Sequence, residues 1–199
     1  MTLIIKFFLF LSIFFTKMLY NRRNFIKTLG LVYGSLLLAP SCTSTKSRYR
    51  VFTDDEAACL IALCEQIIPA DEDPGATDAG VINFIDKQTY LRFPEELPVY
   101  QQGIASLQAT CKAQFGKLFE QLESSVQIEV MQNMERNRLP EEHWTKEAGQ
   151  STFFNLTLRR AMQGFYGAPR HGGNKNYVSY KMMRLDYPLL IGQNRYRHG

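Results

Sequence analysis

The chain has 199 residues and a formal net charge of +4 at pH 7. Residues 1–41 contain five Lys/Arg and no Asp/Glu, so the remaining 158 residues hold 18 basic against 19 acidic side chains, a formal charge of −1. Because phosphate neutralisation needs a basic face on the folded domain, this balance argues against a nucleic-acid partner. The 158 residues are enough for one domain with a single core.

An export signal is indicated by residues 21–42, where basic residues precede a short apolar stretch and then small residues. The apolar part, about residues 29–38, is shorter than the roughly 18 residues of a spanning helix. The basic part resembles the twin-arginine signal, which exports proteins already folded around a cofactor. The residues expected to carry it are Arg22, Arg23, Phe25 and Lys27.

Cys42 follows the sequence LAPS and resembles the acylated cysteine of a lipoprotein cleavage box. Because one acyl chain anchors only weakly, a membrane-bound protein would require a diacylated cysteine. The alternative is an ordinary cleaved signal with a chance cysteine at this place. Residues 42–51 are then a polar tether between the lipidated cysteine and the folded body. We expect an exported, periplasmic, membrane-associated lipoprotein.

The first seventeen residues add a second apolar run in front of the arginines. This reverses the usual basic-then-apolar order of a signal peptide, so Met18 is an alternative start of the protein. A true anchor helix is the competing interpretation. Lys6 interrupts the run, which argues against that helix. The expected organisation is a signal over 1–41, the tether over 42–51, and one helical domain over 52–199.

Helical periodicity dominates the rest of the chain. Thr53 and Glu56 form a capping-box pattern, and apolar residues then recur at steps of three and four until Pro69. Further helices are expected at about 81–90, 98–115, 124–137 and 148–165, the fourth of the five helices beginning at Ser124 or Ser125. Since no segment alternates like a strand, we predict an all-α fold, an irregular helical bundle with a loop-rich C-terminal tail.

Three cysteines lie within this domain. Cys59 and Cys64 stand about 140° apart around one helix, which is a poor geometry for a bridge between them. Cys111 could pair with one of them in an oxidising compartment. The alternative is that all three thiols are buried as small hydrophobic side chains.

Motifs for cofactors and metals are absent from the sequence, which has no CxxCH, GxGxxG, P-loop or HExxH. The acidic run of residues 71–78 lacks the spacing of an EF-hand loop, and we expect a solvated loop rather than a calcium site. Of the three histidines, His171 is the best candidate for a small polar site. We therefore expect no catalytic residues, no metal and no cofactor bound by this chain.

The densest functional signal is GFYGAPRHGGNKNYVSYKM, residues 164–182. Glycines permit tight turns, while tyrosines and basic side chains are typical of interface hot spots. The alternative is that the segment folds back and its tyrosines complete the domain's own core. The candidate partner-binding residues are Tyr166, Arg170, His171, Gly172, Gly173, Asn174, Tyr180 and Lys181.

Two stretches together, FTDDEAACLIALCEQIIPADEDPGATDAGVINFIDKQ and FFNLTLRRAMQGFYGAPRHGGNKNYVSYKM, resemble the gluconate 2-dehydrogenase subunit 3 family. The resemblance runs from about residue 52 to 185. Its most specific parts are residues 68–71, 79–81 and 167–174. Where the family has a Trp-Lys pair followed by a Gly-Tyr-Pro turn, this chain has Tyr180-Lys181 and then residues 184–188. That departure leaves the partner and the substrate class open.

The resemblance implies a small accessory subunit that assembles with and co-exports a large FAD-dependent dehydrogenase acting on a sugar, a sugar acid or a polyol. FAD is then expected in the partner, a cytochrome c is a further candidate subunit, and the substrate is a property of the other chain. An independent lipid-anchored enzyme or binding protein, with a polar site around His171, is the alternative. A deep, closed pocket at His171 would favour the alternative.

Overall fold

The computed structural model describes residues 47–185 of the chain. The predicted export signal and Cys42 lie outside the described residues. Within them the protein is helical and contains no strand, so the all-α prediction is confirmed. No helix in this described part is both long and apolar enough to cross a membrane.

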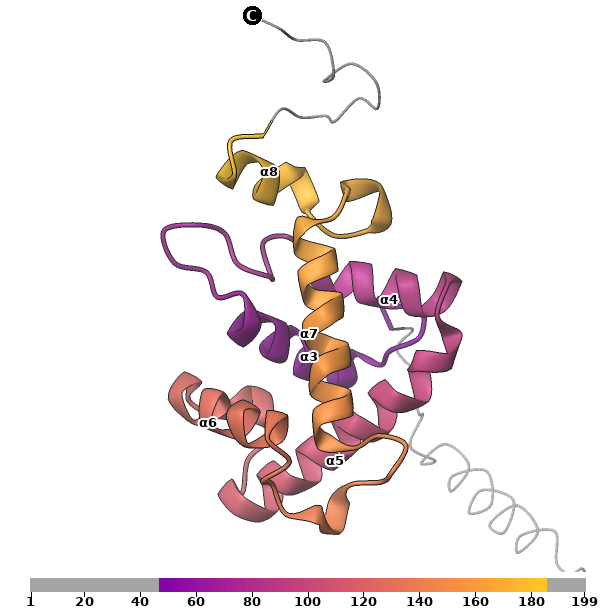
Figure 1. Cartoon of the computed structure of the whole chain (residues 1–199), viewed down its shortest axis with the longest axis vertical. Coiled ribbons are helices and arrows are strands. Elements are labelled where there is room, and N and C mark those ends of the chain that lie inside the picture. Colours follow the sequence, from indigo (N-terminus) through magenta and orange to yellow (C-terminus); the bar gives the residue numbers. More distant parts are fainter. Residues whose placement is uncertain (1–46, 186–199) are drawn as a thin grey trace, which may run out of the picture. The chain divides into compact units, whose positions relative to one another are not determined.

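The longer helices are those that the sequence periodicity predicts (Figure 1). They are α3 (Asp54–Ile67), α4 (Val81–Leu91), α5 (Leu97–Phe115), α6 (Ser124–Glu135) and α7 (Gln150–Tyr166). The capping box at the start of α3 is confirmed, because Thr53 Oγ1 accepts from the Glu56 amide at 3.2 Å and Glu56 Oε2 accepts from the Thr53 amide at 2.8 Å. This reciprocal pair satisfies two backbone donors that the first turn would otherwise leave unpaired.

Helix α6 begins at Ser124, as predicted, but it ends earlier than predicted. Glu123 is its N-cap without a side-chain cap, and the Ser124 hydroxyl instead donates to Gln66 Oε1 on α3 at 3.1 Å. At the other end the helix stops at Glu135 rather than 137, because Asn137 takes a left-handed conformation with φ 53°. Asparagine tolerates this conformation better than most residues, which favours termination here.

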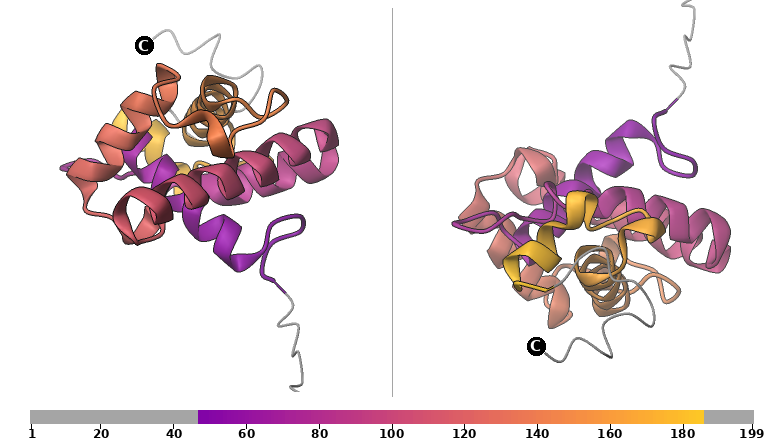
Figure 2. Two further views of the ribbon diagram at one scale, coloured as in Figure 1. Left: turned by 90° about the horizontal axis from the view of Figure 1, so that it is seen from below. Right: turned by 90° about the horizontal axis from the view of Figure 1, so that it is seen from above.

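Helix α7 forms the centre of the domain and packs against α3, α4, α5 and α6 (Figures 1 and 2). Its buried face contains Phe153, Leu156 and Phe165, while Met162 on the same helix is 42% exposed. Gly103 of α5 allows that helix to pack closely against α7, because a β-carbon at this position would collide with the Phe153 ring. Two aromatic pairs, Phe52 with Tyr100 and Tyr100 with Phe153, continue this core at edge-to-face geometry.

Asp86 ties the start of the domain to α4. Its carboxylate is 1% exposed and accepts from the backbone amides of Arg50 and Val51 at 2.7 and 3.0 Å and from Arg50 Nη1 at 3.0 Å. A buried carboxylate is stable only with such partners. These bonds hold residues 50–51, the end of the expected tether, against the bundle.

The C-terminal part is more ordered than a loop-rich tail suggests. It contains two 3-10 turns, η4 (Pro169–His171) and η5 (Lys175–Tyr177), and the short helix α8 (Val178–Met182). Helix α8 contacts α7, and η4 contacts α4 (Figure 1). The sequence pattern did not predict α8 because a five-residue helix is too short to show a period.

Candidate functional site

The segment from Gly164 to Leu185, called here the C-terminal segment, lies on the bundle through close backbone contact. A β-carbon on Gly173 would overlap the carbonyl oxygen of Gly164, and Gly172 has φ 112°. Only glycine fits both requirements without strain. The glycines that the sequence suggested for a docking surface therefore position the segment on its own domain.

Asn174 fixes the turn that follows. It is fully buried, its Nδ2 donates to the Gly167 carbonyl at 2.9 Å, and its Oδ1 accepts from the Ser179 amide at 3.0 Å. The next residue, Lys175, donates its backbone amide to the Ala79 carbonyl at 2.9 Å. Asn174 thus connects the end of α7 to the start of α8, a structural role that needs both ends of its side-chain amide.

Two side chains of α4 hold the η4 turn. Lys87 Nζ donates to the Arg170 carbonyl at 2.7 Å, and Gln88 Nε2 donates to the His171 carbonyl at 3.2 Å. In both bonds the two residues are 83 positions apart in the sequence, so no local sequence pattern predicts them. They place the side chains of Arg170 and His171 beside the C-terminal half of α4.

An open hollow of about 350 Å³ lies between α4, α7 and η4, and His171 lies at its edge. Arg92, Phe93, Arg160 and Gln163 are among its lining residues. It is not the deep, closed pocket that would favour an independent binding site. A hollow of this shape can accept a single side chain that protrudes from another protein, but it does not enclose a whole substrate molecule.

Arg160 forms the floor of this hollow and is held firmly. Its Nε donates to Glu96 Oε2 at 3.0 Å and its Nη2 to Glu96 Oε1 at 2.6 Å, while its Nη1 donates to Gln163 Oε1 at 2.7 Å. The guanidinium also lies 3.8 Å from the centre of the Phe93 ring. The two side chains are only 8% and 14% exposed, so the pair is a bidentate, largely desolvated contact.

The surroundings of His171 are electropositive. Partial burial lowers the pKa of its imidazole from 6.5, and the nearby charges of Arg170, Arg92 and Lys87 lower it further. Its Nε2 accepts a hydrogen bond from Arg170 Nε at 3.2 Å. The ring is therefore neutral at pH 7 and acts as an acceptor there. No carboxylate lines the hollow, so the geometry provides no acid–base pair.

The predicted partner-binding residues divide into two sets. Gly173, Asn174 and Tyr180 are buried within the domain, and Tyr180 is 6% exposed. The other predicted residues, which remain at least partly open to solvent, are Tyr166, Arg170, His171, Gly172 and Lys181. The interpretation that the segment completes the domain's own packing holds for the first set, and a contact with a partner remains available to the second.

Helix α4 supplies surface residues that the sequence reading did not single out. Lys87, Tyr90 and Leu91 occupy one exposed face, and the two apolar side chains are 56% and 59% exposed. Positions three and four apart share a helix face, so this stripe was in principle visible in the sequence. This stripe was not identified from the sequence because helical periodicity picks out the buried face. Tyr90 and Leu91 are apolar, so their sequence alone does not distinguish them from core residues.

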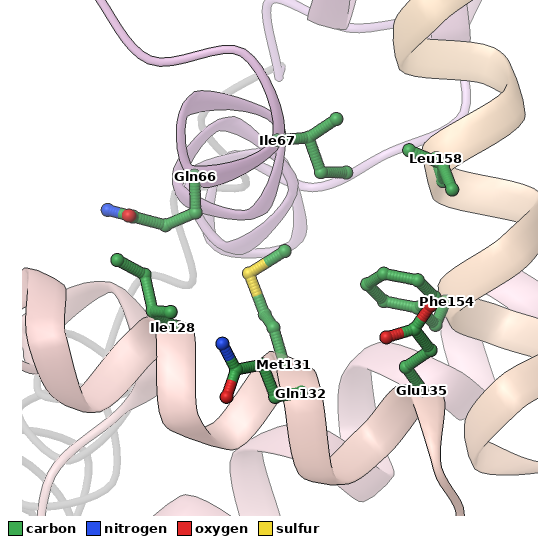
Figure 3. A pocket seen from close by; sticks show the side chains of 8 residues that line it. All are labelled: Gln66, Ile67, Ile128, Met131, Gln132, Glu135, Phe154 and Leu158. Atoms are coloured by element: carbon green, nitrogen blue, oxygen red, sulfur yellow. The ribbon is translucent and has the colours of Figure 1, made fainter.

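A second, smaller hollow of about 200 Å³ lies between α3, α6 and α7 and is lined mainly by apolar side chains (Figure 3). Figure 3 shows Met131 between the exposed Ile128 and Phe154, with Gln66 and Ile67 above them. Three amides or carboxylates, Gln66, Gln132 and Glu135, complete the lining. This hollow contains no cation or histidine.

Cys59, Cys64 and Cys111 are free and buried, which confirms the interpretation of three unbridged thiols. Burial raises the pKa of Cys64 and of Cys111 to about 12, and it also raises that of Cys59. Thiols protonated in this way are poor nucleophiles and poor metal ligands. Residues 47–185 contain no cluster of His, Cys, Asp or Glu that could hold a metal ion.

The protein is therefore a small helical domain in which the charged and aromatic side chains of the candidate site line an open hollow rather than a closed pocket. The chain belongs to the gluconate 2-dehydrogenase subunit 3 family, which it matches over residues 54–186. The family is named for a subunit of an oxidoreductase complex, so a dehydrogenase partner is supported. Among curated proteins no match was found, and none was found among solved structures.

Proposed function

We propose that the chain is a non-catalytic accessory subunit that assembles with a large FAD-dependent dehydrogenase of the gluconate 2-dehydrogenase type. The observation that carries the proposal is the family match, which spans all but a few of the described residues. In this proposal the partner holds FAD and oxidises the CH–OH group of a sugar, a sugar acid or a polyol, and a cytochrome c subunit accepts the electrons.

The open hollow supports the accessory role over the alternative of an independent enzyme. Its floor is an arginine already bound to Glu96 and Gln163, and its histidine is a neutral acceptor among cations. A substrate site needs groups placed to bind and to move protons, and this set offers fixed charge without an acid–base pair. Fixed charge and exposed aromatic surface suit a protein contact.

Co-export is the second part of the proposal. Arg22, Arg23, Phe25 and Lys27 would direct the chain to the twin-arginine route, which accepts folded, cofactor-loaded proteins. A flavoprotein without its own signal could then cross the membrane bound to this subunit. Lipidation at Cys42 would keep the complex at the membrane on the periplasmic side.

The test is purification of the tagged full-length chain from membranes, followed by a flavin spectrum and electrophoresis. We expect yellow material with a second, large band. Colourless, single-band material from cells that contain the dehydrogenase would contradict the proposal. For the anchor, Cys42→Ala should release or stall the protein, and unchanged mass and fractionation of that variant would exclude lipidation.

A further inference from the structure

One surface next to the hollow combines apolar and positive groups, and we call it the α4–η4 face. It consists of Lys87 and Leu91 of α4, of Arg92, which follows the last residue of that helix, and of Arg170 and His171 of η4. Lys87 joins the two elements through its 2.7 Å bond to the Arg170 carbonyl. This bond holds the Lys87 ammonium close to the η4 turn that carries Arg170, although the two residues are far apart in the sequence.

The positive charge of this face is not neutralised within the described domain. Across residues 47–185, Lys87, Arg92 and Arg170 form no ion pair; Arg92 and Arg170 are exposed and Lys87 is half-buried. Glu96, the acid that contacts Arg160 of the hollow, is already bound twice by that arginine and lies 3.6 Å from Arg159. Charge without an internal partner attracts an external anion, most strongly in a concave site where water is restricted.

The shape selects the kind of anion. Arg92 lines the hollow from the α4 side and His171 from the η4 side, with the Phe93 ring and Arg160 below. A planar carboxylate can accept two hydrogen bonds from one guanidinium. Leu91, which precedes Arg92 and lies three positions after Gln88 of the hollow, is 59% exposed and supplies apolar surface beside the charged contact.

We propose that the α4–η4 face binds the dehydrogenase subunit by taking one of its Asp or Glu side chains into the hollow at Arg92, while Leu91 packs on apolar surface beside that acid. This rests on the proposed function, because it assigns the partner's contact to this face. It also moves the centre of the contact from the tyrosines of the C-terminal segment to α4.

The experiment compares matched variants of the tagged full-length chain, co-expressed with the flavoprotein that co-purifies with the wild type. Arg92→Glu reverses a charge at the hollow, and Lys117→Glu makes the same change at an exposed residue between α5 and α6. Leu91→Ala removes an exposed apolar side chain at the face, and Phe115→Ala removes one at the end of α5 that is 42% exposed. Flavin absorbance per tagged chain is measured at low and high salt.

We expect Arg92→Glu to reduce capture at least about tenfold and Leu91→Ala several-fold, with the two controls unchanged. The wild-type complex should weaken as salt rises, since screening acts on exposed charges. Thermal unfolding of each variant separates lost binding from lost folding. If both face variants keep wild-type capture and stability, the contact lies elsewhere and the inference is wrong.

Two further results would overturn the inference in other ways. If Arg92→Glu instead abolishes binding to vesicles containing anionic lipid while flavoprotein capture stays unchanged, the face binds the membrane surface. If the wild-type chain itself carries no flavoprotein, the proposed function fails and this inference fails with it. A photo-crosslinking residue in place of Leu91 gives an independent check: a covalent adduct with the flavoprotein from that position, and none from Phe115, supports the assignment.

Discussion

The carbonyl oxygen of Gly164 occupies the position that a β-carbon on Gly173 would require. Both partners of this contact belong to backbone, so neither can move aside like the end of a flexible side chain. The C-terminal segment therefore depends on one missing side chain for its place on α7. The consequence can be measured directly.

Gly173→Ala should destabilise the domain by about 2 kcal/mol, because the added methyl group must displace packed backbone. The measurement is urea unfolding, together with limited proteolysis of the C-terminal segment, which should be cut sooner. Gly149→Ala is the matched control, since its nearest neighbour to a new β-carbon is 3.7 Å away and its φ is −64°. Equal stability of the two variants would contradict the predicted close contact.

Glu96→Gln should lower the free energy of unfolding by about 3 kcal/mol. The change leaves the Arg160 guanidinium, 8% exposed, without its carboxylate partner, and breaking a desolvated pair costs more than the pair contributes. The neighbouring Glu95 is exposed, so Glu95→Gln should stay within about 0.5 kcal/mol of wild type. Chemical denaturation of both variants checks this, and a small effect of Glu96→Gln would mean that water reaches Arg160.

The two tyrosines of the predicted docking segment should behave differently. Tyr180 is 6% exposed, so Tyr180→Ala should cost about 3 kcal/mol through the cavity that it leaves. Tyr166 is 39% exposed and makes an edge-to-face contact with Phe165 at 4.9 Å, so Tyr166→Ala should cost about 1 kcal/mol. Thermal unfolding ranks the two. Capture of the flavoprotein should be affected by Tyr166→Ala only if the contact extends to the end of α7.

The buried thiols predict a loss of stability at alkaline pH. Their folded pKa, about 12 for Cys64 and Cys111 against an ordinary 9.0, means that the folded state keeps protons that the unfolded chain releases. Stability from these groups is full below pH 9 and falls as pH rises from 9 towards 12. Unfolding of wild type and of Cys64→Ala over this range checks the slope, which should be smaller in the variant.

The same thiols should not react with alkylating reagents in the native protein. At pH 8 iodoacetamide should modify Cys59, Cys64 and Cys111 only after denaturation, as mass spectrometry can show. Rapid modification of the folded protein would contradict the described burial.

Export should depend on the arginine pair. Replacing Arg22 and Arg23 together by lysine keeps the charge but removes the two guanidinium groups, so precursor should accumulate in the cytoplasm. Fractionation and immunoblotting measure this, and loss of the flavoprotein from the periplasm in the same cells would support co-export. Normal processing of the double variant would favour general secretion.

Local patterns in the sequence were sufficient for the five longer helices but not for α8. The Thr53–Glu56 capping box involves residues three positions apart, and the apolar stripe that predicts α3 repeats at steps of three and four, so the residues that decide this helix are near one another in the chain. The family resemblance rests on the same continuous stretches, and the match over residues 54–186 confirms it.

Long-range contact decided the rest. Whether Tyr180 is a docking residue or a core residue depends on the packing of α8 against α7, and the place of His171 depends on bonds from Lys87 and Gln88 that lie 83 positions away. The sequence was compatible with either bridged or free cysteines, and the packing of α3 against α5 in the structure shows three free, buried thiols. Periodicity reports which face of a helix is apolar, but only the tertiary arrangement determines which neighbour covers that face and which residues, such as Tyr90 and Leu91, are left uncovered.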